Sequence, residues 1–235
     1  MIQKWYRLYA SSLLAGICIS IGCIVNLKTG GVVGPIMFAF GLITVVHYKF
    51  KLFTGTAGFI HGKQEAYQLV HILIGNIIGC LIMAWLTSML CPDIIEKGQS
   101  LALARMSTSA FGQLIFGILC GFIMTTAVQF ARQDKWLPLL FGVPVFILCG
   151  FYHCIADAFY ICLQSPLLLL TPAYCMIVVG NFIGCNMTRW LLPDSLNWWH
   201  YETQTIDSLS RLSPSLPVCC FGSTGYYQKT ASSCR

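Results

Sequence analysis

A six-residue motif occurs twice in this chain, each time inside a long apolar stretch. Gly-Asn-Ile-Ile-Gly-Cys occupies residues 75–80, and Gly-Asn-Phe-Ile-Gly-Cys occupies residues 180–185. Upstream of each copy a polar segment interrupts another apolar stretch: Leu-Phe-Thr-Gly-Thr at 52–56 in the first half and His-Cys-Ile-Ala-Asp at 153–157 in the second. Paired interruptions of this kind in two halves of a membrane protein indicate a binding site for a transported species.

The composition places the chain in a lipid bilayer. Only 9% of its 235 residues are charged and 57% are hydrophobic, whereas a soluble domain averages about 25% charged residues. A chain this apolar cannot bury its surface in one water-soluble core. At about 20 residues per transmembrane helix, the length allows six spans and a short tail. The apolar runs occupy residues 8–27, 31–50, 67–91, 108–131, 136–151 and 171–192.

The order of these runs predicts the topology. Three precede a connector at residues 92–107 and three follow it. Because halves with an odd number of spans enter the membrane from opposite sides, the repeat must be inverted. We therefore predict an all-α membrane protein with six transmembrane helices as two inverted three-helix repeats, in which helices 2 and 5 are broken. The predicted channel domain covers residues 1–192.

Residues 193–235 are rich in Ser, Thr and Pro, so we expect a poorly ordered cytoplasmic tail. Lysine and arginine are more frequent in the loops that this topology places inside. This bias predicts a multi-pass protein of the plasma (inner) membrane with both termini in the cytoplasm.

The second interruption carries two ionisable residues. His153 and Asp157 are four residues apart, so they would share one face of a helix. Ionisable side chains within a span normally face an interior or a water-filled path. The competing interpretation is a histidine that only packs. We expect Asp157 to form an ion pair with Lys51 from the first interruption at the centre of a pore.

The first interruption is less decisive. Thr54 can offer a hydroxyl group to a passing species, and irregular backbone at this depth must line a cavity or be buried in protein. Alternatively, the second span ends near Val46 and the lysines that follow extend to the membrane surface.

The repeated motif favours a scaffold role. Its glycines stand four residues apart, a spacing that lets transmembrane helices approach closely, and its asparagines can form hydrogen bonds across helices or hold the interrupted segments. The scaffold residues are Gly75, Asn76, Gly79, Gly180, Asn181 and Gly184.

Several classes of function find no support. The sequence contains no carboxylate pair, Ser/His/Asp set, phosphate-binding loop or redox motif, so we expect neither an enzyme nor a bound cofactor or metal. The net charge of +6 is not gathered on a basic face, which argues against nucleic-acid binding. Most of the 13 cysteines lie in apolar runs, where cysteine acts as a small hydrophobic residue.

Taken together, the motifs resemble the formate/nitrite transporter family over residues 8–192. The similarity rests on Leu-Phe-Thr at 52–54, on Tyr-His-Cys-Ile-Ala-Asp at 152–157, on Phe-Gly-Ile-Leu-Cys at 116–120 and on both Gly-Asn-x-x-Gly copies. The resemblance implies an aquaporin-like protomer in a homopentamer, with one pore per protomer. Its cargo would be small monovalent anions of weak acids, such as formate, nitrite, hydrosulfide or lactate, together with a proton.

The resemblance also implies roles for individual residues. The family's central histidine, loop threonine and vestibule lysine correspond to His153, Thr54 and Arg105. Two apolar constrictions flank the histidine: an outer one of Phe38, Met124 and Phe146, and an inner one of Leu42, Leu52 and Phe53.

The chain departs from the family pattern in its polar residues. Lys49, Lys51, Tyr152 and Gly121 replace other residue types, and Asp157 stands where the family has asparagine.

The expected mechanism follows from the cost of moving an anion through an apolar passage. Arg105 attracts the anion, His153 protonates it directly or through water, and the neutral acid crosses. The main alternative is a neutral small-solute channel for water, glycerol or a small amide, although paired Asn-Pro-Ala signatures are missing. A redox membrane protein and a scaffold without transport are further alternatives.

Overall fold

The computed structural model describes residues 2–60 and 62–192, and within this part the secondary structure is helical, without strands. The predicted tail, 193–235, lies outside the described residues. The α-helices are α1 (Ile2–Thr29), α2 (Val33–His47), α3 (Phe53–Ala57), α4 (Lys63–Leu90), α5 (Ile95–Ser107), α6 (Ala110–Ala131), α7 (Leu137–Leu148), α8 (Cys154–Gln164) and α9 (Pro172–Leu191). Two short 3-10 helices, η1 (Pro92–Ile94) and η2 (Pro166–Leu170), connect them.

The described helices fit a bilayer in length and composition. Three are long and apolar enough to cross a membrane, at Trp5–Thr29, Lys63–Leu90 and Ala110–Ala131. Large apolar side chains such as Phe40, Trp85 and Phe141 point outward and are at least 60% exposed. An exterior of this kind is stable in lipid but not in water. The prediction of an all-helical membrane protein is confirmed at this level.

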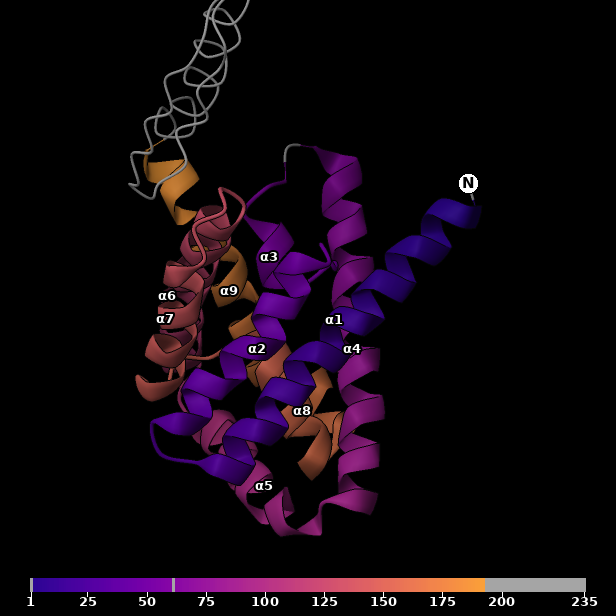
Figure 1. Cartoon of the computed structure of the whole chain (residues 1–235), viewed down its shortest axis with the longest axis vertical. Coiled ribbons are helices and arrows are strands. Elements are labelled where there is room, and N and C mark those ends of the chain that lie inside the picture. Colours follow the sequence, from indigo (N-terminus) through magenta and orange to yellow (C-terminus); the bar gives the residue numbers. More distant parts are fainter. Residues whose placement is uncertain (1, 61, 193–235) are drawn as a thin grey trace, which may run out of the picture. The chain divides into compact units, whose positions relative to one another are not determined.

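The helices of the two halves pack in the same pattern. In the first half α1 contacts α2 and α4, and in the second half α6 contacts α7 and α9. In Figure 1, α1 and α4 lie on one side of the molecule and α6 and α7 on the other, with the short helices α3 and α8 between them. The two halves meet where α2 contacts α7 and where α8 contacts α4.

Glycines bring the long helices into backbone contact. A Cβ atom added at Gly79 would collide with the backbone oxygen of Leu13 in α1, and one at Gly184 would collide with that of Ile118 in α6. Glycine at these helix crossings therefore allows an approach that any other residue would prevent.

Helices α2 and α7 end in the same way. The Phe50 amide donates to the Val45 carbonyl, and the Phe151 amide donates to the Phe146 carbonyl, each at 2.9 Å. This bond closes the Schellman type of helix end, which needs a residue in the left-handed region. Gly150 occupies that position after α7 with φ 70°, whereas a lysine, Lys49, occupies it after α2 with φ 57°.

The chain resumes as a buried short helix after each of these ends. α3 begins at Phe53, and Phe53, Thr54 and Ala57 are buried. α8 begins at Cys154, and its residues through Leu163 are all buried. Both short helices therefore lie inside the protein, where their first turns are shielded from lipid.

Candidate functional site

The first-half asparagine holds the start of α3. The Phe53 amide donates to Asn76 Oδ1 at 2.9 Å. Asn76 Nδ2 donates to the Lys51 carbonyl at 2.9 Å and to the Ser12 carbonyl at 2.7 Å. Because the first amides of a helix lack helical partners, this buried side chain satisfies the Phe53 amide, which would otherwise be unpaired.

The second-half asparagine makes the same set of bonds. The Cys154 amide donates to Asn181 Oδ1 at 2.9 Å. Asn181 Nδ2 donates to the Tyr152 carbonyl at 2.7 Å and to the Gly117 carbonyl at 3.0 Å. Each asparagine thus connects the start of a short helix to a long helix of the same half, α1 for Asn76 and α6 for Asn181.

The starts of the two short helices meet at a histidine–threonine contact. His153 Nε2 lies 3.0 Å from Thr54 Oγ1, and both residues are buried. His153 Nδ1 accepts the Ala156 amide at 3.1 Å, which caps α8. Because Nδ1 accepts, a neutral ring carries its proton on Nε2 and donates it to Thr54.

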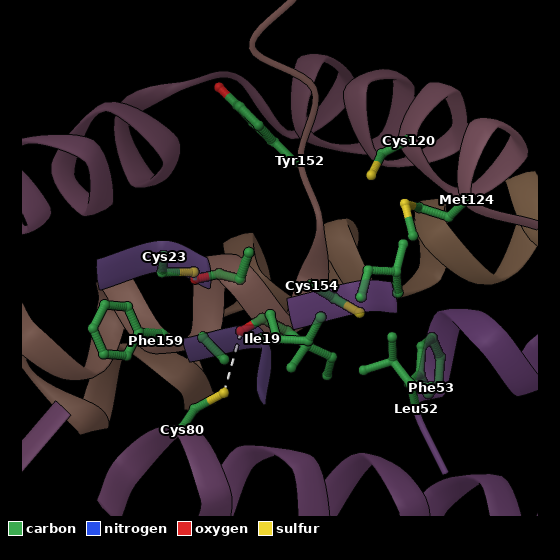
Figure 2. Packing of buried hydrophobic residues seen from close by; sticks show 14 of the residues in the cluster. Ile19, Cys23, Leu52, Phe53, Cys80, Cys120, Met124, Tyr152, Cys154 and Phe159 are labelled. Atoms are coloured by element: carbon green, nitrogen blue, oxygen red, sulfur yellow. Dashed lines mark hydrogen bonds between the residues drawn. The ribbon is translucent and has the colours of Figure 1, made fainter. Parts of the chain in front are cut away.

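Apolar side chains enclose this contact. The Phe146 ring stacks on the His153 ring with centroids 5.6 Å apart, and it meets the Phe38 ring edge-on at 6.0 Å. Figure 2 shows Met124, Leu52 and Phe53 in the core beside Cys154. The residues expected at the two constrictions are all at least 95% buried: Phe38, Met124, Phe146, Leu42, Leu52 and Phe53.

Two hollows border residues of this region. A cavity of about 70 Å³ is lined by Arg105, Asp157 and His153 together with Phe38 and Phe146. A larger hollow of about 670 Å³ is lined by Leu42 and Leu52 and by charged residues, among them Lys49, Lys51, Arg132 and Asp134. Phe38 and Phe146 of the expected outer constriction therefore border the small cavity, and Leu42 and Leu52 of the expected inner one border the larger hollow.

Asp157 forms an ion pair, but not with the predicted partner. Arg105 Nε donates to Asp157 Oδ1 at 2.8 Å, and the Arg105 guanidinium lies 4.9 Å from the centre of the Tyr152 ring. The predicted Lys51–Asp157 pair was wrong. The Lys51 backbone is bound by Ser11 and Asn76, and its exposed side chain borders the larger hollow instead.

Two cysteines contact the short helices in a way that was not predicted from the sequence. Cys80 Sγ donates to the Ile155 carbonyl of α8 at 3.3 Å, and Figure 2 shows this bond. Cys185 Sγ donates to the Thr54 carbonyl of α3 at 3.4 Å. Each sulfur reaches the short helix of the opposite half. The signal was available, since cysteine is the last residue of both motif copies.

A metal site finds no support in residues 2–60 and 62–192, which contain no group of three His, Cys, Asp or Glu side chains placed to hold an ion.

This chain is similar to known membrane transporters and channels. A family model described as "Formate/nitrite transporter" matches residues 1–193. The formate channel FocA of Haemophilus influenzae is 24% identical over 228 residues, which cover 84% of this chain and 78% of that protein. An uncharacterised transporter of Bacillus subtilis, YrhG, is 27% identical over 201 residues, or 73% of each protein.

Solved structures share the fold. One described as a pentameric formate channel with formate bound matches with a TM-score of 0.72 at 17% identity, over 86% of this chain and 98% of that one. One described as an FNT family ion channel matches with a TM-score of 0.66 at 21% identity, over 83% of this chain and 89% of that one.

Proposed function

The chain belongs to the formate/nitrite transporter family, and on that premise we propose that it is a channel or transporter for small monovalent anions of weak acids. Formate, nitrite and hydrosulfide are the candidate cargoes. The observation that carries this proposal is the Thr54–His153 contact, which lies buried among apolar side chains, with a cavity at His153 and a hollow at the neighbouring Leu52. The formate channels among its relatives support formate as the first cargo to test.

The proposed pore runs from the larger hollow past the His153–Thr54 contact to the small cavity. Three cationic side chains and one carboxylate line the larger hollow: Lys49, Lys51, Arg132 and Asp134. An excess of positive charge in a hollow raises the local concentration of anions. Anions therefore gather at this end of the path.

The apolar section of the proposed path gives His153 a role in transport. A bare anion there costs several kcal/mol even after the protein relaxes. Protonation at His153 removes that cost because the neutral acid has no charge to desolvate. Histidine suits this exchange, since its ordinary pKa is about 6.5.

The architecture that we propose around this path has two inverted repeats of three spans. Interrupted spans 2 and 5 would correspond to α2 with α3 and to α7 with α8. The matching bonds of Asn76 and Asn181 and the matching helix ends at Lys49 and Gly150 support it. Both termini would lie in the cytoplasm, and the assembly would be a homopentamer, as in the pentameric relative.

The direct test is uptake into proteoliposomes that contain the purified protein. Formate, nitrite, hydrosulfide and lactate are supplied separately at several pH values between about 5 and 8, where histidine titrates. We expect saturable uptake of at least one of them above the rate of empty liposomes. Uptake of all four at the rate of empty liposomes would refute the proposed cargo class.

A neutral solute is the second candidate, and one observation favours it. Asp157 neutralises Arg105, so the small cavity carries no excess positive charge from this pair. Swelling of the same proteoliposomes in glycerol or formamide, with no response to the weak acids, would favour this candidate.

A further inference from the structure

One oxygen of the Asp157 carboxylate has no hydrogen-bond partner among the described residues. Oδ1 accepts from Arg105, so this oxygen is Oδ2, which is buried. The Asp157 side chain is 2% exposed and lines the small cavity. A buried acceptor left unpaired destabilises the protein. A species in this cavity that brings a hydrogen-bond donor therefore gains stabilisation at Oδ2.

Two other polar side chains around the cavity, those of His153 and Tyr160, are engaged. Both ring nitrogens of His153 have partners, in Thr54 and in the Ala156 amide. The side chain of Tyr160 interacts with those of Cys23 and Asn26. Arg105 is the charged group that faces Asp157, and their pair is close to neutral as a whole. The cavity therefore offers an incoming molecule one acceptor without a partner, Asp157 Oδ2, next to the guanidinium of Arg105, of which Nε alone bonds to Asp157. A molecule that carries both a donor and an acceptor matches this pair.

The size of the cavity limits that molecule to a few non-hydrogen atoms. Its volume is about 70 Å³, and one water molecule occupies about 30 Å³ in the liquid. Formic acid or formamide meets this limit and carries an O–H or N–H donor. A formate ion has no donor, and its charge would face a carboxylate oxygen.

We propose that Asp157 determines the protonation state of the cargo, by accepting a hydrogen bond from the protonated acid at Oδ2 and disfavouring the bare anion. This inference rests on the proposed function and specifies the form in which the cargo occupies this cavity. The asparagine that the family pattern has at this position would supply an amide donor to an anion. An aspartate that pairs with Arg105 through one oxygen presents its other oxygen as an acceptor, which reverses that preference.

The experiment compares the charge carried with each formate in the wild type and in Asp157→Asn. Initial formate uptake into proteoliposomes is measured with and without a membrane potential of about 100 mV, a potential worth about 2.3 kcal/mol per charge, or about fifty-fold. In the wild type we expect uptake to change less than about twofold. In Asp157→Asn we expect a change of at least about fivefold, because the bare anion then contributes to the flux.

Asp93→Asn is the matched control, because it removes a carboxylate that is 60% exposed and paired with Lys28 outside the cavity. It should behave as the wild type. The same voltage response in Asp157→Asn and the wild type, or a strong response already in the wild type, would overturn the proposal.

A second measurement needs only the wild type, in case Asp157→Asn does not fold. Formamide, which carries an N–H donor, should compete with formate uptake, whereas an equal concentration of chloride should not. Competition by chloride without competition by formamide would overturn the proposal. If the wild type takes up no weak acid at all, the proposed function fails. Formamide flux above that of empty liposomes then still supports the donor-selective cavity, and its absence rejects it.

Discussion

At the level of single residues, the proposed transport depends on the groups that bind the His153 ring. Its ring is held from both sides, by the Ala156 amide at Nδ1 and by the Thr54 hydroxyl at Nε2. We therefore expect the hydroxyl to position the ring and to shape its proton exchange. Removal of one buried hydrogen bond costs about 1 kcal/mol, which corresponds to about a fivefold change in an equilibrium or rate constant.

Thr54→Val should lower the initial rate of formate uptake about fivefold and shift its pH profile, because Nε2 loses its partner while the volume stays nearly the same. Thr126→Val is the control, since the Thr126 hydroxyl bonds to the Phe122 carbonyl of its own helix and to no other described residue. Equal rates and equal pH profiles in the two variants would contradict a positioning role for Thr54.

The asparagines allow a test of folding stability at the same scale. Asn181→Leu leaves the Cys154 amide and the Tyr152 carbonyl unpaired in the core. At about 1–3 kcal/mol for each unpaired buried group, we expect a clear fall in the thermal unfolding midpoint in detergent. Asn186→Leu, which loses one bond to the Ala57 carbonyl and one within its own helix, should cost less. The reverse order would argue against this role for Asn181.

Some residue-level features could be predicted from sequence and others could not. His153 and Asp157 both line the small cavity, as expected for ionisable residues within a span. The predicted partner of Asp157 was wrong because α5 brings Arg105 to it. The spacing of the motifs does not indicate how the segment that connects the two halves folds. Residues 92–107 were predicted as a connector, yet most of them form α5.

At the scale of helices, apolar runs predicted where helices occur better than where they end. The run at 31–50 contains α2, which stops at His47, and the run at 136–151 contains α7, which stops at Leu148. The ends depend on local hydrogen bonds and on residues in the left-handed region. Both Lys49 and Gly150 lie in the left-handed region. Glycine is typical of that conformation and can be recognised in the sequence, whereas a lysine gives no such indication.

The close approach of the helices at their crossings leads to the next prediction. Gly184→Ala should lower the unfolding midpoint strongly, because the new methyl group would collide with the Ile118 backbone, which cannot move without separating α6 from α9. Gly55→Ala is the control, since its methyl group would lie 3.7 Å from the Leu52 Cβ atom, an ordinary contact. A midpoint for Gly184→Ala at or above that of Gly55→Ala would show that the crossing tolerates a side chain.

At the scale of the whole molecule, the outward apolar surface must be covered by lipid or by other copies of the chain. Side chains such as Phe111 and Leu170 are more than 70% exposed in one protomer. We propose five copies around a central axis, and native mass spectrometry from detergent should give a mass of five times 26.1 kDa. A monomer or dimer as the main species in mild detergents would contradict this assembly.

We infer that weak acids cross at His153 by exchanging a proton. The most direct measurement records formate uptake and internal pH together in proteoliposomes, for the wild type and for His153→Ala, across pH values of about 5 to 8. The account predicts that wild-type uptake depends on pH and is accompanied by internal acidification, and that His153→Ala loses both. Uptake with the same pH dependence in His153→Ala would contradict it.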